Sequence, residues 1–493
     1  MKEILDSATM RRCDQRTIEE HHVPSLVLME RAALSVAVEI RTNFKEALNI
    51  TVVCGPGNNG GDGVAIARML KIAGKNVRCI VLGNQEKFTE QLSSEIAMAE
   101  SYGLKIEYDI DEEAFEKADL VVDAMFGIGL TRGLSGQFEY AAQLMNQCAL
   151  QVVAVDIPSG YDADCGKLLG QVGVQAHTTV TFAYMKKGLV LGDCKKAAGK
   201  VIVADVGIYL DREKDSFATI VDSDILHLLP PRPVDANKGT CGKLLVIAGS
   251  KNIYGACYLS AKAALRAGTG LVKIYTHTNN IASIQQGLPE AMYLGYTEYN
   301  KEELLQQISW ADTILMGPGL GTSELSQDIV KTVLENPSKP MIIDADGLNI
   351  AAQNKELLKQ AAAKAPIIIT PHLKEMERLC GTPVAQINND MENVAKSFAD
   401  EYKITVILKN FTTIIASANT INYVTSGDEG LATPGSGDVL AGIVSSFVGQ
   451  KILPQIAVLA ATYIHGAAGH MASEELGTRA VLASDIIENI HRF

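Results

Sequence analysis

Short apolar runs that end in Gly, Asp or Ser recur along the first half of the chain and predict buried strands. Helical apolar periodicity separates them, for example in residues 64–74, and two helices are expected earlier, one capped by Asp6 and Ser7 and one after Pro24. This alternation is typical of a mostly parallel sheet wrapped by helices, with ligands at the carboxyl ends of the strands. The runs are residues 50–54, 76–83, 119–127, 151–160 and 178–182.

A second series of the same kind follows a change of composition at residues 209–240, which are charged and then rich in proline. Because 493 residues exceed one ordinary hydrophobic core, we expect an α/β protein of two domains, residues 1–215 and 222–493. The second series consists of expected strands within 243–250, 270–276, 312–321, 341–347, 366–372 and 405–410, a helix from 256 to 267 and helices after Gly437.

The net charge of −13 argues against nucleic acid or an anionic membrane as a partner. A phosphorylated small molecule stays possible, because backbone N–H groups at helix starts bind phosphate without net basic charge. The nine cysteines are scattered and form no C-x-x-C pair, and no apolar run is long enough to span a bilayer. We therefore expect a cytoplasmic protein.

Polar residues gather after several expected strands of the first domain. The segment Gly57–Gly63 reads as a glycine-rich loop between a strand and a helix, which is either a tight turn or an anion site. Asp123, Asp156 and Ser159 follow neighbouring strands, where each is either a turn cap or part of a shared pocket. We interpret Asp156 as a general acid/base and the other two as oxygen ligands for a cation.

These residues lie within motifs that resemble the NAD(P)H-hydrate epimerases over about residues 1–215. The motifs are ATMRRCD, LVLMERA, NNGGDG, DAMFGIG and DIPSGYDADCG, in family order. The resemblance implies a Rossmann-like three-layer α/β/α sandwich in which Asn59, Asp123 and Ser159 bind potassium. It implies contacts to the hydrated cofactor from Asn58, Asn59, Gly60, Gly61, Asp62, Gly127, Ile128, Gly129, Leu130, Thr131, Arg132, Gly133 and Asp156.

The segment TPGSGDVLAG at 433–442 is the most informative part of the second domain. Small residues at a helix start expose N–H donors to phosphate, and an acid there accepts a hydroxyl proton during phosphoryl transfer. Asp438 is therefore the expected base, the alternative being a plain helix cap. Asp344 and Asp346 are expected to cap a helix and are left out of the site.

This segment resembles the ribokinase-like kinases and, more narrowly, the NAD(P)H-hydrate dehydratases, over about residues 222–493. The narrower resemblance rests on KGTCGKLLVIAGS, RAGTGLV, GPGLG, DADGLN, TPHLKEMERL and LKNFTT. It implies a ribokinase-like α/β/α domain with Ala256, Gly319, His372 and Asp438 at the hydrated cofactor, and Lys409, Asn410, Phe411, Thr412, Thr413 and Gly437 at the nucleotide. Taken alone, His372 is as often structural as a ligand. Lys409 follows an expected strand and could reach phosphate, the alternative being a solvated lysine. The chain departs from the family pattern at Leu373, Lys374, Asn410 and Pro434, which leaves the preferred nucleotide open.

The two resemblances together imply repair of hydrated NADH and NADPH. One domain would epimerise the R and S hydrates, and the other would dehydrate the S form with hydrolysis of ADP or ATP, through a phosphorylated intermediate and with Mg²⁺. The fused arrangement favours ADP, and we expect a homo-oligomer. The alternative is a vitamin-precursor kinase fused to a binding module without catalysis.

Overall fold

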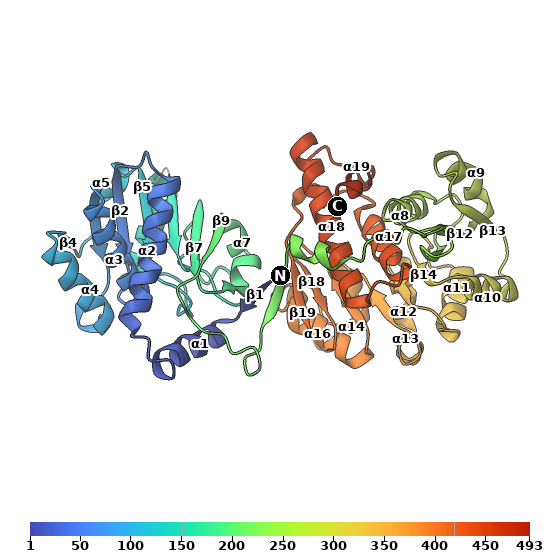
Figure 1. Ribbon diagram of the computed structural model, residues 1–493, viewed down its shortest axis with the longest axis horizontal. Helices are drawn as coiled ribbons and strands as arrows, with labels where there is room; N and C mark the ends of the chain where they lie inside the picture. Colours follow the sequence, from blue (N-terminus) through green and yellow to red (C-terminus); the bar gives the residue numbers. More distant parts are fainter. Residues whose placement is uncertain (149–150, 419) are drawn as a thin grey trace. The chain divides into compact units, whose positions relative to one another are not determined.

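The computed structural model describes residues 1–148, 151–418 and 420–493, and the chain divides into two compact units, Lys2–Phe217 and Ala218–Phe493 (Figure 1). Each unit has an α/β fold with a largely parallel sheet, as the sequence predicted. Among the described residues, no helix combines the length and apolarity needed to cross a lipid bilayer.

The sheet of the N-terminal unit is parallel throughout, in the strand order β4-β3-β2-β5-β6-β7-β9. All five expected strands are confirmed, as β2, β3, β5, β6 and β7. Strands β1 and β8 also pair in parallel, outside this seven-stranded sheet. The strands are β1 (Lys2–Leu5), β2 (Asn49–Cys54), β3 (Asn76–Val81), β4 (Ile106–Glu107), β5 (Leu120–Ala124), β6 (Val152–Val155), β7 (Thr178–Phe182), β8 (Met185–Lys186) and β9 (Lys200–Ala204).

Helices cover both faces of this sheet because its strands are apolar on both sides. Val52 and Val122 pack with α2, α3 and α4, whereas Val53 and Val121 pack with α5 and α6 on the opposite face. Asp6 caps α1, as expected, by accepting from Thr9 N at 2.7 Å. The helices are α1 (Ser7–Glu19), α2 (Ser25–Asn43), α3 (Asn58–Ile72), α4 (Glu90–Ser101), α5 (Glu112–Glu116), α6 (Gln137–Cys148) and α7 (Cys194–Ala197).

The expectation that Gly57–Gly63 forms a loop between β2 and α3 is wrong. Helix α3 already begins at Asn58, so the motif NNGGDG forms its first turns. The glycines allow this helix to lie against the strands, since a Cβ on Gly60 would fall 1.9 Å from the Gly55 carbonyl oxygen. A Cβ on Gly63 would fall 2.5 Å from Ala124 Cβ and 2.6 Å from Cys54 Sγ.

The sheet of the C-terminal unit runs β13-β12-β11-β14-β15-β16-β17-β18-β19-β10. It is parallel except where β18 pairs antiparallel with β17 and β19. All six expected strands are confirmed, as β11, β12, β14, β15, β16 and β17. The strands are β10 (Ala218–Val221), β11 (Lys243–Ile247), β12 (Leu271–His277), β13 (Met292–Tyr296), β14 (Thr313–Met316), β15 (Met341–Ile343), β16 (Ile367–Ile369), β17 (Thr405–Leu408), β18 (Thr413–Ala416) and β19 (Ile421–Val424).

One hydrophobic core of this unit lies between the sheet and helices α8, α17, α18 and α19. The expected helix at 256–267 is confirmed as α8, and the expected helical end of the chain as the other three. The helices are α8 (Gly255–Arg266), α9 (Thr278–Gly287), α10 (Lys301–Trp310), α11 (Glu324–Glu335), α12 (Asp346–Gln353), α13 (Lys355–Ala362), α14 (Leu373–Cys380), α15 (Val384–Asn389), α16 (Met391–Tyr402), α17 (Ser436–Gly449), α18 (Pro454–Leu476) and α19 (Ala483–Asn489).

Replacing Gly63 by alanine tests the close packing of α3 on the sheet. We expect Gly63→Ala to lower the free energy of unfolding of the N-terminal unit by about 1–3 kcal/mol, because the new methyl group overlaps two buried atoms. Gly129→Ala is the control, since a Cβ there has no heavy atom within 4 Å. Denaturant unfolding of both variants measures the difference, and equal stability of the two would contradict the packing argument.

Two candidate active sites

The first polar cluster of the N-terminal unit centres on Asp123, which is fully buried at the end of β5. Its carboxylate accepts from Ser159 N and Ser159 Oγ, each at 2.7 Å, and from Met125 N at 3.2 Å. Burial raises the pKa of Asp123 to about 6, although these donors act in the opposite direction. The structure therefore brings together Asp123 and Ser159, two of the three expected potassium ligands.

Asp156 follows β6 in a left-handed backbone conformation, with φ of 67°. Its Oδ1 lies 2.7 Å from Lys186 Nζ and accepts from Thr181 Oγ1 at 3.2 Å. Its Oδ2 accepts from Ile128 N at 3.3 Å. A non-glycine residue with positive φ costs free energy, so this conformation has to be held by its surroundings. The Asp156 carboxylate is thus fixed by three different segments of the unit.

Gly127 lies between Asp156 and Asn59, the third expected potassium ligand. A Cβ on Gly127 would lie 2.8 Å from Asp156 Oδ2 and 3.2 Å from Asn59 Oδ1, so both side chains border this glycine. The preceding residue, Phe126, donates its N–H to Ser159 Oγ at 3.0 Å. Asn59, Asp123, Asp156 and Ser159 therefore surround one short stretch of backbone.

The other expected cofactor contacts lie at the start of α3 and in the stretch after Gly127. Burial is the main cause that raises the pKa of Asp62 well above its ordinary value, followed by the charge of Asp156. Asn58, Gly129, Thr131 and Arg132 are exposed, at the outer side of the cluster. The sequence analysis missed Lys186, whose only local signal is a lysine a few residues after a buried strand.

In the C-terminal unit two of the residues expected at the nucleotide, Lys409 and Gly437, meet at the start of α17. Gly435 precedes this helix with φ of 89°, and a Cβ on Gly437 would lie 3.1 Å from Lys409 Nζ. Lys409 Nζ in turn lies 3.0 Å from Asp344 Oδ1. The helix N-terminus and a lysine thus offer N–H groups and positive charge at the same place.

Asp438, in the first turn of α17, has an environment suited to proton transfer. Burial raises its pKa to about 7, the Asp344 charge adds to this effect, and the Lys409 charge opposes it. A carboxyl group that titrates near neutral pH can both accept and release a proton under ordinary conditions. Asp438 also acts electrostatically on Cys257, next to Ala256 in α8.

The role expected for Asp344 and Asp346 as helix caps is wrong. The residue at the cap of α12 is Ala345, with φ of 50°, and no side chain caps this helix. Asp344 is buried and pairs with Lys409, whereas Asp346 Oδ2 accepts from Gly321 N at 2.9 Å. Asp344 therefore belongs to the polar cluster, and its place at a strand end was the available signal.

His372 is itself the cap of α14. Its Nδ1 accepts from Lys374 N at 3.1 Å and from Glu375 N at 3.2 Å. Burial lowers the pKa of His372, and the nearby Lys409 charge lowers it further. Backbone bridging places His372 beside Lys409, whose N–H donates to Pro371 O at 2.8 Å. The structural and the functional interpretation of His372 are thus compatible.

Ala256 and Gly319 border each other, since a Cβ on Gly319 would lie 3.3 Å from Ala256 Cβ. The remaining expected nucleotide contacts follow Lys409 in the chain. Among them, Asn410 Nδ2 donates to Asn388 Oδ1 at 3.0 Å, Phe411 is exposed and Thr412 is buried.

His465 is a second residue that sequence analysis missed. It is buried on α18, and its Nε2 lies 2.9 Å from Ser436 O and 3.1 Å from Ser436 Oγ. Burial lowers the pKa of His465 to about 4, so the side chain is neutral at physiological pH. The neutral imidazole of His465 holds Ser436, the residue immediately before Gly437.

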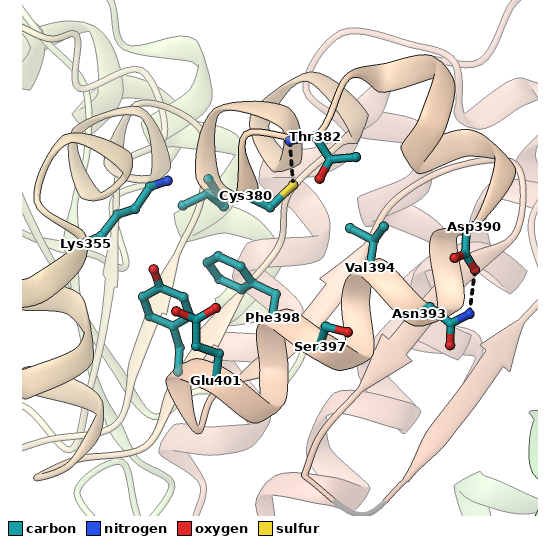
Figure 2. Close-up of a pocket in the computed structure, with 11 residues that line it drawn as sticks. Lys355, Cys380, Thr382, Asp390, Asn393, Val394, Ser397, Phe398 and Glu401 are labelled. Atoms are coloured by element: carbon teal, nitrogen blue, oxygen red, sulfur yellow. Dashed lines mark hydrogen bonds between the residues drawn. The ribbon is translucent and has the colours of Figure 1, made fainter.

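The cavity shown in Figure 2 is lined by residues that belong to neither polar cluster. It encloses about 440 Å³ beside α14 and α16, and its polar contacts are local. Asn393 Nδ2 donates to Asp390 Oδ1 at 2.8 Å, and Thr382 N donates to Cys380 Sγ at 3.4 Å. None of the residues expected at either site lines this cavity, so we place the chemistry at the polar clusters.

Comparison with known proteins matches both units. Residues 244–492 match the family model described as NAD(P)H-hydrate dehydratase, and residues 25–188 match that of the YjeF-related protein N-terminus. A bifunctional NAD(P)H-hydrate repair enzyme of Moorella thermoacetica is 33% identical, over 98% of this chain and 95% of that protein. The enzyme of the same name from Escherichia coli is 34% identical, over 94% of this chain and 88% of that protein.

Solved structures also match the C-terminal half. One is the ADP/ATP-dependent NAD(P)H-hydrate dehydratase from Bacillus subtilis, co-crystallised with ATP and Mg²⁺. It is 29% identical, with a TM-score of 0.48, and the match covers 56% of this chain and 97% of that chain.

Removing one partner of the pair between Lys409 and Asp344 tests its role in the C-terminal unit. We expect Lys409→Met to lower the free energy of unfolding by about 3 kcal/mol, because Asp344 stays buried without its counter-charge. The double variant Lys409→Met/Asp344→Asn should recover most of this loss. Denaturant unfolding without nucleotide measures both, and strictly additive losses would contradict the pairing.

Proposed function

Because this chain belongs to the family of bifunctional NAD(P)H-hydrate repair enzymes, we propose that each of its two polar clusters is the active site of one repair reaction. The enzyme epimerises the R and S forms of hydrated NADH and NADPH, and it dehydrates the S form in a nucleotide-dependent reaction. We assign the epimerase to residues 1–215 and the dehydratase to residues 222–493. The observation that carries this assignment is that each unit holds its own buried acid at a helix or strand end.

In the epimerase, Asp156 exchanges protons with the hydroxyl of the hydrated ring. Water adds to an enamine at the carbon bonded to nitrogen, so the nitrogen lone pair can expel the hydroxyl once it is protonated. Water then returns to the opposite face of the planar C=N carbon and loses a proton to the carboxylate. Asp156 gives one proton to the leaving hydroxyl and takes one back from the incoming water, so a single carboxyl group completes the cycle.

Asn59, Asp123 and Ser159 are the proposed ligands of a potassium ion. Among the residues that the structure describes, the Asp123 carboxylate accepts hydrogen bonds from neutral donors, which belong to Ser159 and Met125. Asn59 Nδ2 is buried and has no hydrogen-bond partner among the described residues, so the side chain can adjust to a ligand. One carboxylate with neutral oxygens suits a monovalent cation, which would supply positive charge beside the site.

In the dehydratase, Asp438 accepts the proton of the ring hydroxyl while the hydroxyl oxygen attacks the terminal phosphorus of ADP or ATP. The Gly437 N–H and the Lys409 ammonium group face the charge that develops on the phosphoryl oxygens. Phosphate then leaves with the C–O bonding electrons as the nitrogen lone pair forms C=N. Loss of a proton from the neighbouring carbon restores the dihydropyridine. The products are NADH or NADPH, inorganic phosphate and AMP or ADP.

Magnesium enters this proposal with the nucleotide. Among the described residues, no group of three or more His, Cys, Asp or Glu side chains is arranged to hold a metal ion. Mg²⁺ in phosphoryl-transfer enzymes is commonly held by substrate phosphates with only one or two carboxylates.

The alternative of a vitamin-precursor kinase joined to a binding module is less well supported. The relatives are repair enzymes that match across both units. The buried and fixed Asp156 carboxylate also suits a catalytic role better than simple binding. A homo-oligomer remains a prediction from the sequence.

Recovery of dihydronicotinamide absorbance tests the two assignments together. With a mixture of R and S hydrate, a nucleotide and Mg²⁺, we expect complete recovery by the intact enzyme. With Asp156→Asn, the recovery should stop near the fraction of S hydrate, or continue only as fast as R hydrate epimerises spontaneously. With Asp438→Asn, no absorbance should be recovered. Full and rapid recovery by Asp156→Asn would remove Asp156 from the epimerase, and no recovery by the intact enzyme with either ADP or ATP would favour the alternative.

The pH dependence of the dehydratase tests Asp438 as the base. Since burial raises its pKa to about 7, the reactive carboxylate form increases as pH rises through 7 and is lost below it. We expect kcat/KM on pure S hydrate to fall about tenfold for each pH unit well below this midpoint. A rate that stays constant from pH 8 down to 5 would argue against Asp438 as the base.

A further inference from the structure

Lys186 in β8 is an unusual lysine because only 1% of it is exposed. Burying an ammonium group is costly unless it is paired and hydrogen-bonded. Lys186 Nζ lies 2.7 Å from Asp156 Oδ1, 2.8 Å from Thr181 Oγ1 and 2.7 Å from Phe182 O. Neither the potassium ligands nor the cofactor contacts proposed for the epimerase include this residue.

These three contacts use all the donors of the lysine. An ammonium group has three N–H bonds, and each has an acceptor here, so none is left for a substrate. The Thr181 hydroxyl accepts from Lys186 and therefore has its own hydrogen available for Asp156 Oδ1, at 3.2 Å. Lys186 therefore does not hydrogen-bond the substrate itself, and the candidate catalytic group that it contacts is the Asp156 carboxylate.

The contacts make the two oxygens of Asp156 unequal. Oδ1 receives the charged donor Lys186 and the hydroxyl of Thr181, whereas Oδ2 receives one backbone N–H, from Ile128 at 3.3 Å. Oδ2 is also the oxygen that borders Gly127, where Asn59 approaches from the other side. The less strongly bound oxygen therefore faces the residues expected at the hydrated cofactor.

We propose that Lys186 is a positioning residue of the epimerase, which holds Asp156 Oδ1 so that Oδ2 exchanges the proton with the ring hydroxyl. The proposal rests on the catalytic role proposed for Asp156. Thr181 supports the same oxygen through its hydroxyl. Lys186 also supplies the positive charge that permits a buried carboxylate in a region that contains the second acid Asp62.

The test is a double-mutant cycle on conversion of R hydrate to S hydrate, separated chromatographically without nucleotide so that the dehydratase is silent. We expect Lys186→Met to lower kcat about 10- to 100-fold with KM changed less than threefold. In the Asp156→Asn background the same change should lower the residual kcat less than twofold, because the residue through which Lys186 acts has lost its carboxylate. Lys187→Met is the matched control, expected to retain at least half of the rate.

Thr181→Val provides a second variant that keeps the ion pair and removes only the hydroxyl. We expect a kcat about 3- to 10-fold lower, and no further loss in the Asp156→Asn background. If Lys186→Met does not fold, this variant still tests whether the contacts at Asp156 Oδ1 act through the carboxylate, and a loss of equal size in the Asp156→Asn background would overturn the inference. Dehydratase activity on S hydrate in the same chains should be unchanged, which reports on the C-terminal unit.

The outcomes separate the inference from the proposal beneath it. Equal fold losses from Lys186→Met with and without the Asp156 carboxylate would overturn the positioning role, as would an unchanged kcat or a change confined to KM. If Asp156→Asn itself keeps the full rate, the catalytic role of Asp156 fails and the inference fails with it. If Asp156→Asn lowers kcat strongly but the effects of the two substitutions are additive, Asp156 stays catalytic and only the positioning role of Lys186 fails.

Discussion

Each unit of this protein depends on an ion pair between a buried aspartate at a strand end and a lysine that lies in a later strand or directly after one. Asp156 pairs with Lys186 in the N-terminal unit, and Asp344 pairs with Lys409 in the C-terminal unit. A buried carboxylate is tolerated only when its charge is balanced and its oxygens are hydrogen-bonded, and these lysines meet that requirement. In the proposed mechanism these pairs keep negative charge close to the reacting groups.

Burial also gives the acids of the two sites different proton affinities. In the C-terminal unit burial and Asp344 raise the pKa of Asp438 to about 7, although Lys409 opposes them. In the N-terminal unit burial raises the pKa of Asp123 to about 6. Acids whose environments differ in this way can be divided between proton transfer and charge balance. The proposed mechanism uses this division, with Asp156 and Asp438 moving protons.

The helix starts that face these acids depend on small residues. At α3 the glycines let the first turns lie against β2 and β5, and at α17 a Cβ on Gly437 would come within 3.1 Å of Lys409 Nζ. His465 fixes Ser436 from behind through Nε2. A helix N-terminus binds anions only if the backbone can come close, so glycine at these positions has a direct electrostatic consequence.

The sequence by itself determined the two α/β units, the strands that carry the candidate sites and the residue types at their ends, because apolar periodicity and turn residues act locally. It also allowed Asp123, Asp156, Ser159 and Asp438 to be selected as candidates. Only the tertiary structure decided that NNGGDG is helical, that Asp344 joins Lys409 rather than capping a helix, and that Lys186 and His465 support the sites. These features depend on contacts between residues distant in the chain, 65 positions apart for Asp344 and Lys409, and no local pattern records such contacts.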